Sequence, residues 1–116
     1  MKKISRGQIW YVELNPTRGA EIHKERPCVV VSSDVIGKLP LKLVVPITGW
    51  DDRYENSPWH VKLEPDSLNC LDKPSTADAY QVRSVAVERF TTCKGVVSPE
   101  QLADIVAAIG IVIEIT

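Results

Sequence analysis

The stretch Arg26–Ser32 (RPCVVVS) places an arginine and a proline directly before a run of β-branched residues. Such a run is typical of a buried strand, and proline is tolerated at a strand's first position. Upstream, Asn15–Glu21 (NPTRGAE) ends another strand-like run, Gln8–Leu14 (QIWYVEL). A charged loop therefore joins two strands and ends in an anchored arginine. Loops on a rigid sheet often carry function, and a guanidinium suits phosphate or carboxylate because it donates two parallel hydrogen bonds.

Four more strands are expected from β-branched or alternating runs bounded by turn residues. They are Lys42–Thr48, Trp59–Leu63, Thr76–Val82 and Thr92–Val97. Pro46 inside the first of these indicates a sheet edge or a bulge. A short helix is expected over Val85–Phe90, started by Ser84.

The C-terminal element is a helix with a capping box. Ser98 is the N-cap, Pro99 takes the first helical position and Gln101 the third. Apolar residues then follow helical spacing at Leu102, Ile105, Val106, Ile109 and Ile113. Several short strands and one terminal helix predict an antiparallel α+β domain, a small barrel.

Length and composition limit the classes of protein to consider. The 116 residues and 44% hydrophobic content favour one globular domain spanning residues 1–116. The chain has no apolar run of membrane-spanning or signal-peptide length, so we expect a soluble, cytoplasmic protein. A net charge of −1 argues against nonspecific nucleic-acid binding. A local basic patch could still form from Arg6, Arg18, Lys24, Arg26, Arg53 and Arg83.

Cysteine and histidine usage argues against a metal centre. The spacing of the three cysteines is too irregular for a zinc motif, and the two histidines lie far apart. Cys28 and Cys93 sit in apolar, strand-like settings and are expected to be reduced core residues. No metal and no cofactor are therefore expected.

An ordered set of motifs carries a resemblance to a known family. Besides the two stretches quoted first, the motifs are Arg6–Trp10 (RGQIW), Pro46–Thr48 (PIT), Gln81–Ser84 (QVRS) and Gly95–Leu102 (GVVSPEQL). In this order and spacing they resemble the MazF/PemK family of toxin endoribonucleases, also called mRNA interferases. The resemblance covers nearly the whole chain. It implies an SH3-like barrel of the CcdB/PemK type with a C-terminal helix, a homodimer, a single-stranded RNA substrate, and inhibition by a cognate antitoxin.

The resemblance also implies a reaction and a catalytic set. The 2′-hydroxyl of the RNA attacks the adjacent phosphate, without a metal, and leaves a 2′,3′-cyclic phosphate and a 5′-hydroxyl. By similarity, Arg26, Thr48 and Glu21 carry this chemistry. A fixed guanidinium suits the charge that develops on the phosphate, and a carboxylate can act as general base. Because the pKa of arginine exceeds 12, we expect Arg26 to act electrostatically. The choice of general base and general acid stays open.

Aromatic and polar residues around the loop after Thr48 suit single-stranded RNA, because unpaired bases stack on aromatic rings. The expected RNA-binding residues are Arg18, Lys24, Trp50, Arg53, Tyr54, Asn56 and Arg83. In some PemK-like proteins an arginine and an aspartate that precede the Gln-x-Arg segment take part in catalysis. Here Asp78 and Tyr80 occupy those positions, so that version of the catalytic set is not expected.

Other interpretations of the same residues stay open. Taken alone, Arg26 is an ordinary strand-end arginine, Glu21 could pair with Lys24 or Arg18, and Arg83 could support the core. A second function is a noncatalytic CcdB-like toxin that binds DNA gyrase, because a shared fold does not fix function. A third is a toxin homologue that has lost activity.

Overall fold

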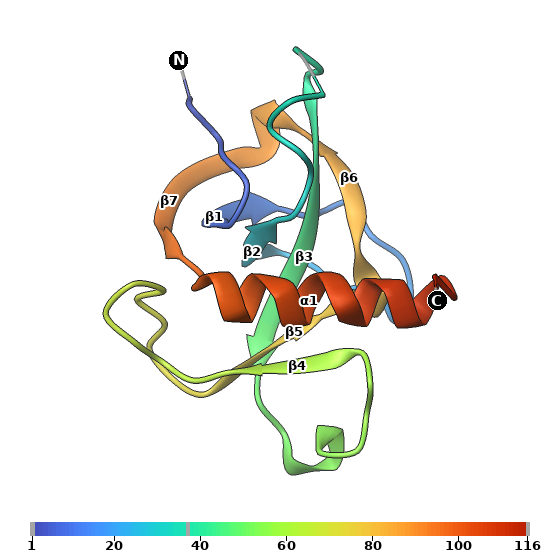
Figure 1. Cartoon of the computed structure of the whole chain (residues 1–116). Helices are drawn as coiled ribbons and strands as arrows, with labels where there is room; N and C mark the ends of the chain where they lie inside the picture. Colours follow the sequence, from blue (N-terminus) through green and yellow to red (C-terminus); the bar gives the residue numbers. More distant parts are fainter. Residues whose placement is uncertain (1, 37, 116) are drawn as a thin grey trace.

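The computed structural model describes residues 2–36 and 38–115 of the chain. Figure 1 shows an antiparallel sheet followed by a single α-helix, α1 (Pro99–Val112). The strands are β1 (Gln8–Glu13), β2 (Glu25–Val30), β3 (Leu41–Gly49), β4 (His60–Leu63), β5 (Ser75–Asp78), β6 (Arg83–Ala86) and β7 (Phe90–Val96).

The strands form one strongly bent sheet. The order is β4-β5-β3-β2-β1-β7, and β6 pairs with one part of β3. Within the described residues no pairing joins β4 to β7, so the sheet stays open. The predicted antiparallel α+β fold with a C-terminal helix is confirmed, and "barrel" describes the sheet only loosely.

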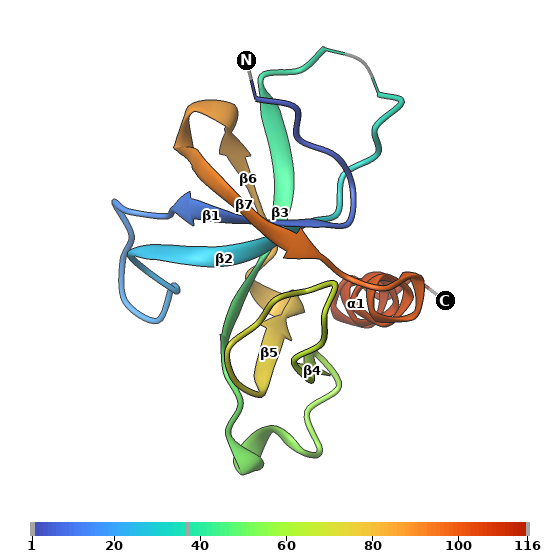
Figure 2. The same ribbon diagram turned by 90° about the vertical axis from the view of Figure 1, so that its left-hand side faces the viewer.

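Strand alternation sends side chains to the two faces of the sheet, and each face has its own core. Figure 2 shows α1 seen end-on beside the bent sheet. Ile9, Val29 and Val45 lie side by side across β1, β2 and β3. They belong to the core that Ile105 of α1 closes. The bent sheet therefore needs both α1 and its own folded-back strands to bury its two faces.

The core on the other face of the sheet contains Trp10 of β1 and Cys28 of β2. Trp10 pairs with Cys28, and both pack in a cluster with Phe90 at the start of β7. The rings of Trp10 and Phe90 meet edge to face, with centroids 5.9 Å apart. Burial raises the pKa of the Cys28 thiol to about 12, which keeps this cysteine protonated and unreactive.

Pro46 lies within β3 at the point where the strand changes partners on one side. Residues 41–44 of β3 pair with β6, and residues 47–49 pair with β5. Pro46 falls between these two ladders, so its missing N–H removes no hydrogen bond from either. The proline thus marks the bend at which β3 passes from one half of the sheet to the other.

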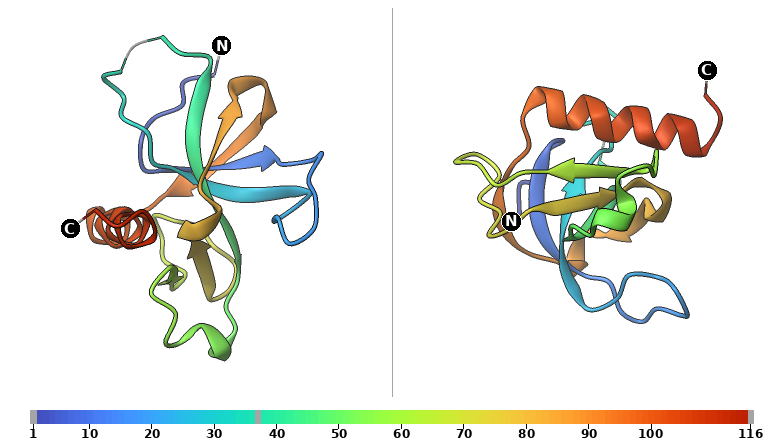
Figure 3. Two further views of the ribbon diagram at one scale, coloured as in Figure 1. Left: turned by 90° about the vertical axis from the view of Figure 1, so that its right-hand side faces the viewer. Right: turned by 90° about the horizontal axis from the view of Figure 1, so that it is seen from below.

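The predicted capping box of α1 is confirmed. Ser98 Oγ accepts a hydrogen bond from the Gln101 N–H at 3.0 Å, and Gln101 Oε1 accepts one from the Ser98 N–H at 2.9 Å. Figure 3 shows α1 lying across the sheet, while the β1–β2 loop projects away from it. In the described chain no helix is long and apolar enough to cross a membrane.

Two expectations from the sequence are wrong. The helix over Val85–Phe90 is absent: β6 extends to Ala86 and a 3-10 turn covers Val87–Arg89. Val85 pairs with Lys42 of β3 and is buried, so long-range pairing overrides local preference. Cys93 is exposed, whereas Cys28 is buried as expected.

The fifth strand is shorter than expected. β5 ends at Asp78, and a 3-10 turn covers Ala79–Gln81. The Asp78 side chain accepts a hydrogen bond from the Tyr80 N–H at 3.1 Å and so starts this turn. The turn displays Tyr80 and Gln81 next to the β1–β2 loop.

Candidate active site

Arg26 and Thr48 project from one face of the sheet. The β2–β3 ladder pairs Cys28 with Pro46. Arg26 and Thr48 lie two residues beyond this pair at the same end of the ladder, and alternation gives residues two apart the same face. Arg26 Nε donates to the His23 carbonyl at 3.1 Å, which fixes the guanidinium against the β1–β2 loop.

Both residues border a cavity of about 180 Å³ at the ends of β2 and β3. Its other polar lining includes Tyr11, Asp72, Lys73, Ser75 and Lys94. The cavity is smaller than the roughly 300–1,000 Å³ typical of small-molecule sites. Because its lining residues include Arg26, Lys73 and Lys94 beside the single acid Asp72, it fits an anionic group such as phosphate better than a whole nucleoside.

Lys94 keeps its charge in this cavity. Its ammonium lies 5.4 Å from the centroid of the Tyr11 ring and 3.5 Å from Asp72 Oδ2. Interaction with the Tyr11 hydroxyl, and then the charge of Asp72, raise the pKa of Lys94. Lys94 therefore acts there as a fixed positive charge and not as a proton donor at neutral pH.

Lys73 reaches the cavity across a glycine. Its Nζ lies 3.3 Å from the position that a Cβ on Gly49 would take. The backbone of this segment is fixed, because Trp50 N donates to the Pro74 carbonyl at 3.1 Å and Ser75 Oγ to the Lys73 carbonyl at 2.8 Å. Sequence reasoning missed Tyr11, Lys73 and Lys94. Tyr11 pairs with Pro27 across β1 and β2, and Lys73 and Lys94 reach the cavity only through folding of the residue 64–74 loop and β7.

Glu21 lies in a different cavity. This cavity, of about 430 Å³, is bordered by the β1–β2 loop, the turn after β5 and Pro46 of β3. The Glu21 carboxylate accepts the backbone N–H of Arg18 at 2.5 Å. The structure therefore brings Arg26 and Thr48 to one cavity and places Glu21 at its neighbour.

Gln81 fastens the loop that carries Glu21. Its side-chain amide accepts the Ile22 N–H at 2.6 Å and donates to the Ala20 carbonyl at 3.0 Å. Arg83 Nη1 donates to the Leu14 carbonyl at 3.2 Å, where the same loop begins. The side chains of Gln81 and Arg83 thus fix the backbone of the β1–β2 loop through hydrogen bonds. Sequence reasoning gave Gln81 no role, although its amide can donate and accept at once.

The aromatic residues after Thr48 contact one another. The ring of Tyr54 stacks on His60 with centroids 3.9 Å apart and an interplanar angle of 3°, and Trp50 meets Tyr54 edge to face at 5.9 Å. The guanidinium carbon of Arg53 lies 5.4 Å from the Tyr54 ring centroid. One face of Tyr54 is therefore occupied by His60, and the Lys62 ammonium lies 4.9 Å from the centroid of the Trp50 ring, so both rings already have neighbours.

His60 and Asp78 form a largely buried pair next to these rings. His60 Nε2 lies 3.6 Å from Asp78 Oδ2, and Ser57 Oγ lies 2.7 Å from His60 Nδ1. Burial raises the pKa of the Asp78 carboxyl, and the charge of His60 opposes this shift. The pair anchors the β3–β4 connection to the sheet.

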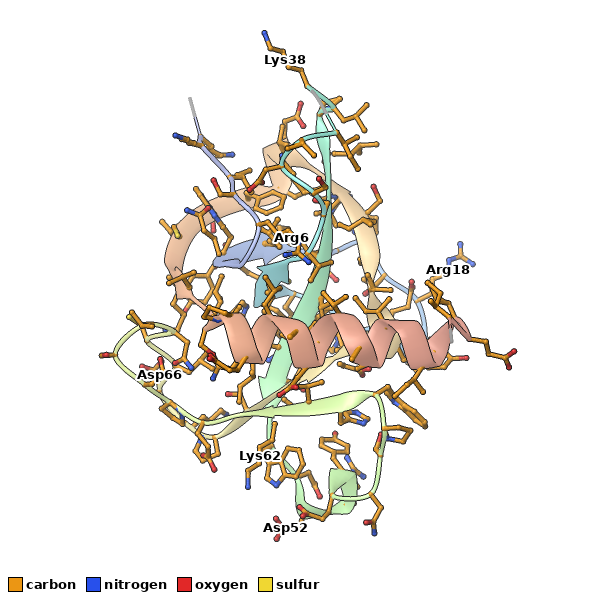
Figure 4. All side chains as sticks on the ribbon, in the orientation of Figure 1. Arg6, Arg18, Lys38, Asp52, Lys62 and Asp66 are labelled. Atoms are coloured by element: carbon orange, nitrogen blue, oxygen red, sulfur yellow. The ribbon has the colours of Figure 1, made fainter. Side chains whose placement is uncertain are left out.

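The remaining predicted RNA-binding residues come from two separate loops. Arg18 and Lys24 are exposed on the β1–β2 loop, and Asn56 is exposed on the β3–β4 connection. In Figure 4, Arg18 lies well apart from Lys62 and Asp52, which mark the β3–β4 side. The structure thus gathers these residues into two groups and not into one patch.

Known structures share this fold. MazF from Deinococcus radiodurans superposes with a TM-score of 0.78 over 97% of each chain, at 21% identity. A structure titled "Endoribonuclease in complex with its cognate antitoxin from Mycobacterial species" has a TM-score of 0.77 over 98% of each chain, at 17% identity.

Sequence comparison gives the family. The model of the PemK-like, MazF-like toxins of type II toxin–antitoxin systems matches residues 5–113. Endoribonuclease MazF9 of Mycobacterium tuberculosis is 36% identical over 108 residues, which cover 88% of this chain and 89% of the relative. The chain belongs to the PemK-like, MazF-like toxin family.

Proposed function

We propose that this chain is the toxin of a toxin–antitoxin pair and cleaves single-stranded RNA, including messenger RNA, at selected sequences. The support is its family, with relatives named as endoribonucleases. The observation that carries the proposal at the site is the placement of Arg26 and Thr48 on one face, bordering one cationic cavity.

The proposed reaction needs neither a metal nor an enzyme nucleophile. The ribose 2′-oxygen forms a bond to phosphorus while the bond from phosphorus to the 5′-oxygen breaks. The 2′-hydroxyl proton passes to a base, and the leaving 5′-oxygen takes up a proton. The products are a 2′,3′-cyclic phosphate and a 5′-hydroxyl. DNA lacks the attacking hydroxyl and is not cut.

Arg26 and Thr48 are the groups we assign to the phosphate. The guanidinium stabilises the charge that grows on the non-bridging oxygens, and its bond to His23 orients it beforehand. The Thr48 hydroxyl donates a hydrogen bond to the same phosphate and holds it for in-line attack. Lys73 and Lys94 add positive charge around it.

Glu21 is our candidate general base. Its carboxylate now accepts the Arg18 N–H and faces the neighbouring cavity. To reach a 2′-hydroxyl at the Arg26 cavity, the Glu21 side chain must release that bond and rotate toward Thr48, while Gln81 holds the loop backbone in place.

The same proposal extends to the RNA-binding surface, the oligomeric state and the inhibitor. Two loops, with Arg18 and Lys24 on one and Trp50, Arg53 and Asn56 on the other, contact the RNA strand. Tyr54 and Arg83 support them. We further propose a homodimer in the cytoplasm, blocked by a cognate antitoxin, because a two-fold dimer is the commonest assembly and a structurally similar endoribonuclease is known in complex with its cognate antitoxin.

End-mapping of RNA cleaved by the purified protein in EDTA tests the proposal. We expect cyclic phosphate ends, and a loss of cleavage by about 100-fold or more for Arg26→Ala, by analogy with the loss of an oxyanion-hole donor. Arg26→Lys keeps the positive charge but loses the planar group that donates two parallel hydrogen bonds. We therefore expect its cleavage rate to lie between those of Arg26→Ala and the unmodified protein. Full activity of a folded Arg26→Ala protein would refute the site.

A further inference from the structure

We propose that the cavity beside Glu21 binds the nucleobase next to the scissile phosphate, with Tyr80 as its stacking surface. The inference rests on the proposed ribonuclease function and deepens it. The cavity has a volume of about 430 Å³, within the range typical of small-molecule sites and more than twice that of the Arg26 cavity.

The walls of this cavity suit a flat, weakly polar ring. Ile22, Pro46 and Val82 contribute apolar surface, and Glu21, Gln81 and Arg83 contribute polar groups at its border. Nucleobases have apolar faces and polar edges, so they are well matched by an apolar floor with hydrogen-bonding groups around it.

Tyr80 supplies an available aromatic ring. It is 64% exposed, and no other large aromatic side chain in the described chain is as open to solvent. Trp59 supports it edge to face, with centroids 5.7 Å apart at 63°. Unlike Tyr54, whose ring is stacked on His60, Tyr80 takes part in no stacked pair among the described residues.

The cavity beside Glu21 is close enough to Arg26 and Thr48 for one RNA strand to contact both places with adjacent nucleotides. Pro46 borders it, and Thr48 follows two residues later on the same face of β3, about 7 Å further along the strand. A strand of RNA whose phosphate is held at Arg26 and Thr48 can therefore turn a neighbouring base onto Tyr80.

The floor of the pocket is built before any ligand arrives. Gln81 bonds both sides of Glu21 through Ala20 and Ile22, and Asp78 fixes the Tyr80 backbone. A pre-formed pocket loses little entropy on binding, which favours base discrimination.

A double-mutant cycle between protein and RNA tests the proposal. The probe is a single-stranded RNA that contains the mapped cleavage site, with a 2′-deoxy sugar at the cut to prevent reaction. Binding is measured by fluorescence anisotropy for this oligonucleotide and for versions with one abasic nucleotide on either side of the scissile phosphate.

We expect Tyr80→Ala to weaken binding by about 10-fold, or about 1.4 kcal/mol, since a stacked base contributes on that order. One of the two abasic oligonucleotides should lose the same factor with the unmodified protein and nothing further with Tyr80→Ala. Tyr80→Phe keeps the ring and should bind within about 2-fold. Leu39→Ala, on exposed surface elsewhere, controls for nonspecific effects.

The outcomes separate the two proposals. Additive losses at both abasic positions, or a Tyr80→Ala protein that is folded and binds normally, overturn the base pocket while RNA cleavage by the unmodified protein leaves the function standing. A change in oligomeric state without a change in RNA coupling also overturns it. Unmodified protein that neither binds nor cleaves RNA overturns both.

Discussion

Gln81 accepts a hydrogen bond from the backbone N–H of Ile22 at 2.6 Å, across 59 residues of sequence. Its amide nitrogen donates to Ala20 at 3.0 Å, so one side chain bonds the backbone on both sides of Glu21. The position of that carboxylate is therefore set from the turn after β5 as much as from its own loop.

Gln81→Ala should loosen this loop and slow RNA cleavage without unfolding the protein. Two hydrogen bonds are lost, each contributing about 1 kcal/mol, and the loop gains conformations in which Glu21 is misplaced. We expect kcat to fall by about 10-fold with a smaller change in KM. Hydrogen exchange at the Ile22 amide should accelerate, and mass spectrometry of the loop peptide measures this without reference to activity.

Gln101→Ala provides a matched control for Gln81. It also removes a glutamine side-chain bond to backbone, but at the N-cap of α1. We expect a comparable loss of stability with unchanged exchange at Ile22 and unchanged cleavage. Gln81→Glu should show an intermediate effect, because it keeps the acceptor for Ile22 and loses the donor to Ala20. Equal activity losses in the Gln81 and Gln101 variants would contradict a positioning role.

The elements that the sequence predicts well are those defined by local chemistry. The capping box of Ser98 and Gln101 needs only neighbours in the chain, and β1 and β3 have unambiguous β-branched runs. The common face of Arg26 and Thr48 depends on one additional fact, the pairing of Cys28 with Pro46.

What the sequence could not predict depends on contacts between distant segments. Val85 joins a strand because β3 pairs with it, and Cys93 is exposed because of how β7 lies on β1. Lys73 and Lys94 reach Arg26 from a loop and a strand that show no special motif. The separation of Glu21 from Arg26 depends on loop geometry that Gln81 imposes.

Asp78→Asn should raise stability at neutral pH and have little effect in acid. Burial raises the pKa of Asp78, so the folded state binds this proton more tightly than the unfolded state does. The resulting stabilisation is complete below the unfolded pKa, about 4, and is lost as pH rises through the folded pKa. Asparagine stays neutral and can still accept the Tyr80 N–H.

Urea unfolding between about pH 3 and about pH 8 measures this difference. The Asp78→Asn curve should meet that of the unmodified protein at low pH and lie above it at neutral pH. Asp104→Asn, an exposed change on α1, controls for altered net charge. If Asp78→Asn instead lost stability as pH rose, attraction to His60 would outweigh burial.

Two glycine substitutions should change stability in opposite directions. A Cβ at Gly95 would lie 2.5 Å from the Leu68 carbonyl oxygen and 2.7 Å from that of Asn69, so β7 must move away from the loop. Overpacking of this kind costs about 1–3 kcal/mol.

A Cβ at Gly110 in α1 meets nothing closer than 3.8 Å, and alanine is favoured over glycine in a helix by about 1 kcal/mol. Urea midpoints should therefore fall for Gly95→Ala and rise for Gly110→Ala, with unchanged m-values. A tolerated Gly95→Ala would mean that β7 and the loop at Leu68 are not held as close together as the structure has them.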